Sequence, residues 1–507
     1  MATAVLGTRL NPAGSVSIDT GVNLDTNGLS GDATPFPRRQ IGPPLLSHDF
    51  LAALNAAGVV AESIVHVTNV QDTVATPPNP TWKTRSGKPA MELTVADPGR
   101  GRGQFVLQTA ESGVVTWHFA KPAGASGSDK RRYLLVRKPP PPPAANTQTA
   151  SPAPAQLVLP GALGGQTIHV LSFPWNPLPG IAHQIVSAWE GLNRRYRVRS
   201  FTPQNYQIDS VPDFTDRDWA SVAKSEGRSL LIIHGTYSLS HTDFGRLPPE
   251  FVARMNATYS NRVFAFDHPT LTEDPRQNAQ WFLDHMPDGT ELDLDIICHS
   301  RGGLVSRVLA EKFGELSAGA RKVSVGSLVF IAAPNQGTAL TDANRLADYI
   351  EAYTNLINFG PAVPAGAAAS VKEILEVLVK IAKLLAVGVA PGLSGLESML
   401  PNGPFLTWLN SGSTGNTKYY ALGSDFEPLG NPGQKDWLEE RIDGIFNAKN
   451  DSIVPTDGVW DLTKPIRFPI TGPDCLVLPE ALGVDHGGFF QNPDSQVKIA
   501  AWLGLKP

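Results

Sequence analysis

Beyond about residue 157, short apolar runs alternate with stretches whose apolar residues recur at helical spacing. A strand buried on both faces forms a continuous apolar run, whereas a helix lying on a sheet keeps one apolar face. The alternation therefore predicts a mainly parallel sheet with helices on both faces. The expected strands are 168–171, 230–234, 262–266, 292–298, 328–331, 419–422 and 475–478.

Residues 1–138 show a different pattern. Short strand-like runs, among them 104–107 and 114–119, are separated by Gly- and Pro-rich breaks. This spacing predicts a small β-sandwich after a poorly ordered start of roughly 45 residues. Five consecutive prolines then open a Pro/Ala/Ser/Thr/Gln-rich segment at 139–156, which is typical of an extended linker. We expect a β-rich domain at 1–138, this linker, and an α/β domain at 157–507.

Composition narrows the class of protein. A chain of 507 residues is longer than one usual core and is consistent with two domains. The formal net charge of -5, with acidic and basic residues interspersed, carries no nucleic-acid signature. Cys298 and Cys475 cannot form a disulfide framework. The N-terminus lacks a basic region and a long apolar core, so we expect a cytoplasmic protein, with signal-independent export as the alternative.

The segment Cys-His-Ser-Arg-Gly-Gly at 298–303 follows an expected strand and precedes a helical pattern. A serine on such a strand-to-helix turn projects its hydroxyl above the sheet edge, facing the next backbone N–H and the helix N-terminus. Ser300 is therefore the candidate nucleophile. Gly302 supplies one of the small neighbours that the turn needs, and Cys298 replaces the first glycine of G-x-S-x-G. An ordinary Ser/Gly turn is the alternative.

The partners of this serine should follow it in the order Asp or Glu, then His. His486 is the only histidine after Ser300, and its glycine-flanked loop precedes the last helical pattern, where a general base is needed. For the acid, spacing favours Asp451 only modestly over Asp425 and Asp457. Any of the three could instead be a turn residue that hydrogen-bonds its own backbone.

A second oxyanion donor is expected in the loop after an earlier strand. The apolar run 230–233 ends in His234-Gly235-Thr236, which has this form. We assign the two donors to the backbone N–H groups of Thr236 and Arg301. The side chain of His234 is expected to hold the loop by hydrogen bonds.

Five motifs occur in the order seen in lipase-like α/β-hydrolases: His-Gly-Thr at 234–236, the 298–303 turn, Ala-Ala-Pro-Asn-Gln-Gly-Thr at 332–338, Asn-Asp-Ser-Ile-Val-Pro at 450–455 and Asp-His-Gly at 485–487. Over roughly residues 165–507 the chain resembles a bacterial lipase or esterase. The resemblance implies the α/β-hydrolase fold and places Asp451 ahead of Asp425 as the acid. It points to an uncharacterised lipase-like branch and supplies no substrate.

An insertion at about 340–416 interrupts the alternation of strands and helices. Within it, residues 370–385 are mostly aliphatic, and four of their five charges share one helical face. These charges exclude a membrane span. The broad apolar face suits either a lid over an acyl pocket or a core-packing helix, and its position favours the lid. The segment 392–410 also resembles the one that follows the lid in lipases. The four charges are Lys372, Glu376, Lys380 and Lys383.

These features predict a serine hydrolase that cleaves carboxylic esters through Ser300, His486 and Asp451. The alternatives are an acyltransferase or amidase on the same triad, and a non-catalytic binding protein on a hydrolase scaffold. We expect no cofactor and no metal, because no ligand cluster surrounds His486. The expected partners are a small-molecule or lipid ester, with transient contact to a lipid surface and no nucleic acid. For the N-terminal domain we weigh binding of a protein partner against an inert spacer.

Overall fold

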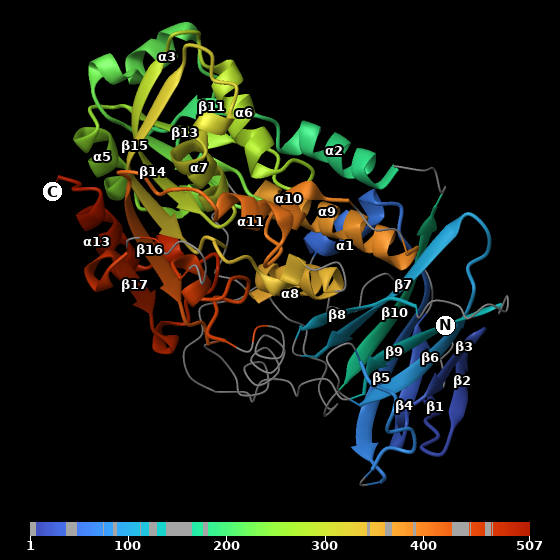
Figure 1. Ribbon diagram of the computed structural model, residues 1–507. Coiled ribbons are helices and arrows are strands. Elements are labelled where there is room, and N and C mark those ends of the chain that lie inside the picture. Colours follow the sequence, from blue (N-terminus) through green and yellow to red (C-terminus); the bar gives the residue numbers. More distant parts are fainter. Residues whose placement is uncertain are drawn as a thin grey trace.

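A computed structural model describes the protein, and Figure 1 shows a β-rich N-terminal part beside an α/β part. The expected linker at 139–156 lies outside the residues that the structure describes. Those residues are 7–36, 48–74, 76–84, 89–111, 113–120, 129–137, 165–175, 181–341, 345–359, 368–388, 392–427, 446, 448–461, 468 and 470–506.

The N-terminal part consists of two antiparallel sheets, as expected of a β-sandwich. The six-stranded sheet has the order β1-β4-β5-β10-β7-β8, and the four-stranded sheet has the order β2-β3-β6-β9. Val65 and Ile168 of the first sheet share one buried cluster with Leu93 and Tyr133 of the second, so the sheets pack face to face. The strands are β1 (Thr8–Arg9), β2 (Ser15–Asp19), β3 (Val22–Asp25), β4 (Leu29–Phe36), β5 (Val60–Asp72), β6 (Ala90–Ala96), β7 (Arg102–Ala110), β8 (Val115–His118), β9 (Lys130–Val136) and β10 (Gln166–Pro174).

The expectation of a poorly ordered start is wrong for residues 7–36, which contain β1 to β4. In β3, Val22 and Leu24 are buried while the intervening Asn23 and the final Asp25 are only partly covered. This strict alternation buries one face of a short strand. Because the segment 7–36 also contains many polar residues, the sequence did not predict these strands.

The run 168–171 is a strand, but its expected place in the C-terminal sheet is wrong. It lies in β10, which pairs with β5 and β7, so the N-terminal sheet extends past the expected boundary at 157. Ile168 and Val170 enter the sandwich core, whereas Leu171 and Phe173 join a second buried cluster under the helices. Because β10 is buried on both faces, apolar residues occur on both of its faces, as they do in a central parallel strand.

The C-terminal part is built on a seven-stranded sheet with the order β11-β13-β12-β14-β15-β16-β17. Its pairings are parallel except that between β11 and β13. The six strands expected from 230 onward are all present. The edge strand β11 escaped prediction because arginines occupy alternate positions in it. The strands are β11 (Arg197–Ser200), β12 (Ser229–Ile233), β13 (Val263–Asp267), β14 (Glu291–His299), β15 (Lys322–Ile331), β16 (Lys418–Ser424) and β17 (Cys475–Leu478).

Helices cover both faces of this sheet. Residues of α6 and α7 share one buried cluster with one face, and residues of α5 and α13 share another cluster with the opposite face. Within the described residues, no helix combines the length and apolar character needed to cross a membrane. The α-helices are α1 (His48–Ala56), α2 (Ile181–Asn193), α3 (Asp216–Val222), α4 (Ser240–Asp243), α5 (Pro249–Thr258), α6 (Pro275–His285), α7 (Gly302–Glu311), α8 (Leu346–Phe359), α9 (Ala368–Ala386), α10 (Ser394–Glu397), α11 (Pro404–Leu409) and α13 (Pro493–Trp502). Short 3₁₀ helices lie at Lys224–Glu226, Phe244–Arg246, Phe313–Glu315, Ala339–Thr341, Asp457–Val459, Gly472–Asp474, Glu480–Leu482 and Phe489–Gln491.

The helix expected as a lid, α9, packs between the two parts of the protein (Figure 1). It contacts α1 and β7 on the N-terminal side and α2 and α8 on the other. Leu378 and Ile381 are fully buried. The Lys383 ammonium donates to the carbonyl of Ala57 at 2.7 Å and lies 5.0 Å from the ring centroid of Phe173. This burial favours the core-packing alternative for α9.

The neighbouring helix α8 connects the edge of the N-terminal sandwich with the C-terminal part. The Asn355 side chain accepts from Val115 N–H at 2.9 Å and donates to Val115 C=O at 2.8 Å. Glu351 accepts from Trp117 N–H at 3.2 Å. At 100° per residue, Tyr349 and Tyr353 lie on the opposite face of the helix. There they pack against Tyr237, with Tyr353 at a centroid distance of 4.9 Å. Side chains of α8 thus complete the hydrogen bonding of the edge strand β8.

Candidate active site

Ser300 lies on the sharp turn between β14 and α7. Its φ of +51° is in the left-handed region, which costs a non-glycine residue about 1–3 kcal/mol and persists only where surrounding structure enforces it. The Ser300 N–H donates to Ile331 C=O at 2.8 Å. A side chain at Gly302 would place Cβ 2.5 Å from the carbonyl oxygens of Ile233 and His234. The turn therefore requires glycine at 302, while the compact Cys298 is fully buried two residues before the serine.

The structure brings Ser300, His486 and Asp451 together in one hydrogen-bonded chain. The Nε2 atom of His486 lies 2.9 Å from the Ser300 hydroxyl, and its Nδ1 atom lies 2.7 Å from Oδ2 of Asp451. All three residues are at most 4% exposed. Because a carboxylate oxygen accepts, Nδ1 carries the proton and Nε2 is free to accept from the serine.

Asp451 is held rigidly by its own turn. Its Oδ1 atom accepts from the N–H groups of Ile453 at 3.0 Å and Val454 at 2.7 Å, and its carbonyl accepts from His486 N–H at 2.9 Å. The turn-forming role considered for this residue is thus present beside its contact with the imidazole. The rival Asp425 forms an ion pair with Lys449, and Asp457 begins a 3₁₀ helix.

The loop after β12 approaches the serine as closely as glycine allows. A Cβ atom at Gly235 would lie 2.6 Å from Cβ of Ser300. Among the described residues, the backbone N–H groups of Thr236 and Arg301 have no hydrogen-bond acceptor. The two candidate oxyanion donors therefore lie on the segments next to Ser300, and their N–H groups are available to bind an oxyanion.

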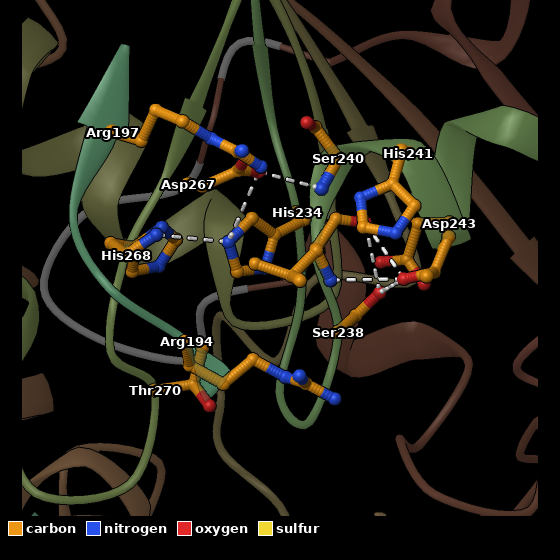
Figure 2. Close-up of polar contacts among 12 residues, drawn as sticks. Arg194, Arg197, His234, Ser238, Ser240, His241, Asp243, Asp267, His268 and Thr270 are labelled. Atoms are coloured by element: carbon orange, nitrogen blue, oxygen red, sulfur yellow. Dashed lines mark hydrogen bonds and ion pairs between the residues drawn. The ribbon is translucent and has the colours of Figure 1, made fainter. Parts of the chain in front are cut away.

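Buried polar contacts fix the start of this loop (Figure 2). His234 Nδ1 lies 2.9 Å from Gly235 C=O, and its Nε2 accepts from His268 N–H at 3.1 Å, which is the structural role expected for its side chain. Burial lowers the pKa of His234. Figure 2 also shows Asp267 between Arg197 and Ser240. It accepts from Arg197 Nη2 and from Ser240 N–H, each at 2.7 Å.

The sequence did not indicate a role for the side chains of three residues at the site, which are Asp243, His299 and Arg301. His299, the residue before the serine, lies between Asp243 and the backbone of His486. The side chain of Arg301 is fully buried, donates from Nε to Gly395 C=O at 3.1 Å, and so ties the turn to α10. Burial lowers the pKa of Arg301 to about 10. The position of His299 beside Ser300 was the available sequence clue, but Asp243 is 56 residues away from it.

Comparison with known proteins places the chain in a family. It belongs to the family described as "Domain of unknown function (DUF7379)", which matches residues 193–504. No curated protein matches the chain.

Several solved structures are similar to part of the chain. Phospholipase PlaB from Legionella pneumophila is 13% identical with a TM-score of 0.35, over 55% of this chain and 60% of that protein, so the chain spans less than two thirds of the phospholipase. Lipase 1 from Pelosinus fermentans is 12% identical with a TM-score of 0.34, over 55% and 97%. A putative alpha/beta hydrolase family protein from Desulfitobacterium hafniense is 15% identical with a TM-score of 0.30, over 56% and 98%.

Proposed function

We propose that this protein is a serine hydrolase of the α/β-hydrolase type that cleaves carboxylic esters. The observation that carries the proposal is the hydrogen-bonded chain from the Ser300 hydroxyl through His486 to Asp451. It lies at the carboxyl edge of a mainly parallel sheet, where ligands bind in α/β proteins. A serine, an imidazole with its acceptor nitrogen toward that serine, and a carboxylate behind the imidazole together supply an activated nucleophile.

In the proposed reaction, His486 Nε2 takes the hydroxyl proton as Ser300 Oγ attacks the ester carbonyl carbon. The carbonyl oxygen becomes an oxyanion, which the N–H groups of Thr236 and Arg301 stabilise. The imidazolium returns its proton to the departing alkoxide, so that alcohol leaves and an acyl-serine remains. Water then attacks this ester with His486 again as base, and collapse releases the carboxylic acid and restores Ser300.

Asp451 has two tasks in this scheme. It keeps the proton of the resting imidazole on Nδ1, and it stabilises the imidazolium that forms during attack. Its second oxygen is occupied by two backbone N–H groups, so the carboxylate cannot rotate away from the histidine without losing them.

The test is an esterase screen with p-nitrophenyl esters from acetate to palmitate. Ser300→Ala should lower turnover by up to about a million-fold. Ser306→Ala is the matched control, because its buried hydroxyl donates to Gly302 C=O within α7 at 2.8 Å and contacts the Cys298 thiol, away from the proposed triad. Turnover by Ser300→Ala within tenfold of the parent protein would refute the proposal.

A further inference from the structure

His299 forms a second Asp–His pair directly behind the proposed triad. Its Nδ1 atom lies 2.8 Å from Oδ2 of Asp243, and its Nε2 atom lies 2.9 Å from the carbonyl oxygen of His486. A backbone carbonyl and an ionised carboxylate can accept hydrogen bonds but cannot donate them. Both ring nitrogens must therefore carry protons, and His299 is an imidazolium paired with the Asp243 carboxylate.

The surroundings of the pair agree with this charge state. His299 faces Asp243 of α4, the ring of His486 at a centroid distance of 4.9 Å, and Phe490 at 5.4 Å. Burial lowers the pKa of His299, but the charge of Asp243 and the hydrogen bond to it, together with Asp451 nearby, outweigh burial and raise the pKa overall. Burial raises the pKa of Asp243, whereas His299, Ser238 and His234 lower it, and its pKa ends well below the usual range.

The pair connects three segments that supply different parts of the proposed chemistry. Asp243 Oδ2 also accepts from Gly235 N–H at 3.1 Å, and the next residue, Thr236, carries a proposed oxyanion donor. His299 belongs to the turn of Ser300. Its Nε2 holds the backbone of His486, the proposed base. The oxyanion loop, the nucleophile and the base thus share one buried, charge-assisted link.

We propose that Asp243 and His299 are positioning residues for the ester-cleaving site, because they set the distance between Thr236, Ser300 and His486. This inference rests on the proposed function. Neither residue touches the reacting atoms in the scheme. A displacement of about 1 Å in such a site can cost about 100-fold in rate, so the pair should act on kcat rather than on KM.

The kinetic test compares Asp243→Asn and His299→Gln with the parent protein. We expect kcat to fall by roughly 10- to 100-fold with KM within about threefold. Asp274→Ala is the matched control for lost stability, because Asp274 caps α6 by accepting from the N–H groups of Arg276 and Gln277. The control should lower Tm with kcat unchanged. A kcat for His299→Gln within threefold of the parent value would overturn the proposal.

The pair should also shape the pH profile. The raised pKa of His299 means that its link to the loops persists to higher pH than an ordinary histidine would allow, and is lost as pH rises through that pKa. We expect Asp243→Asn to shift the alkaline limb of kcat/KM to lower pH, because the imidazolium loses its counter-charge. An unchanged alkaline limb would contradict this role, whereas a merely stabilising pair would lower Tm without moving the profile.

An NMR measurement separates failure of this inference from failure of the proposed function. In the Ser300→Ala protein labelled with ¹⁵N-histidine, both nitrogens of His299 should have imidazolium shifts at pH 7.5, and the Nδ1 proton of His486 should give a protected downfield signal. Adding Asp243→Asn should abolish both signatures. If the parent protein hydrolyses no ester, the proposed function fails. A neutral His299, or a His486 signal unaffected by Asp243→Asn, would overturn the positioning role whether or not esters are cleaved.

Discussion

The contact between α8 and β8 yields a prediction about how the two parts of the protein unfold. Replacing Asn355 with leucine keeps the number and branching of the side-chain heavy atoms but removes both hydrogen bonds to Val115. Two buried backbone groups are then left without partners, at about 1–3 kcal/mol each. The expected loss in the free energy of unfolding is therefore about 2–6 kcal/mol.

The loss should appear in a single transition for the whole protein. One buried cluster contains Trp117 of β8, Leu378 of α9 and Phe330 of β15, so the sandwich and the α/β part share a core and should unfold together. Differential scanning calorimetry and urea unfolding measure this directly. Asn193→Leu is the control, because it removes only a hydrogen bond of 2.9 Å to Trp189 C=O on a partly covered surface. Its cost should be about 1 kcal/mol or less.

Two results would refute this reasoning. If Asn355→Leu has the same urea midpoint as the Asn193→Leu control, the edge contacts of β8 do not stabilise the protein. If the parent protein unfolds in two separate transitions, with only the first moved by the substitution, the sandwich is an independent domain and the shared core does not couple the two parts.

Three further experiments test the proposed acid, the insertion and the buried His169. Asp451→Asn should lower kcat by about 10⁴-fold and Asp425→Asn by far less, because Asp451 is the one bonded to the imidazole; the opposite ranking in steady-state kinetics would transfer the role. Combining Leu378→Asp with Ile381→Asp should lower Tm and activity on all ester chain lengths together, since both side chains are fully buried; a selective loss on long chains with unchanged Tm would restore the lid. Burial lowers the pKa of His169 to about 4, below its unfolded value of about 6.5, so stability is lost as pH falls between them. Urea unfolding at pH 7.5 and pH 4.5 measures this loss of stability. In His169→Leu the loss should be smaller by roughly 2–3 kcal/mol. A loss as large as in the parent protein would contradict the lowered pKa of His169.

Much of the α/β part was predictable because its signals are local. The runs at 230–233 and 296–298 are apolar throughout, as a strand covered on both faces requires. The proximity of Ser300, Asp451 and His486 was predictable because the carboxyl ends of parallel strands share one edge, and the loops after them must meet there.

What could not be predicted depends on contacts between distant segments. The sequence near 168–171 does not reveal that this strand belongs to the N-terminal sheet. One of its faces packs in the sandwich core, and Leu171 on the other face joins the cluster under the helices. The position of α9 within the insertion favoured a lid, but Leu378 is fully buried and Lys383 reaches Ala57 in the N-terminal part. Likewise, His299 gains its role only when folding brings Asp243 to it.

Labelling with a fluorophosphonate probe, followed by intact-mass analysis and peptide mapping, tests directly whether Ser300 is the nucleophile of a serine hydrolase. We expect one adduct per chain, on Ser300, with labelling abolished in both Ser300→Ala and His486→Ala and retained in Ser306→Ala. An unlabelled parent protein, or an adduct that persists in Ser300→Ala, would contradict the assignment of Ser300 as the nucleophile of a serine hydrolase.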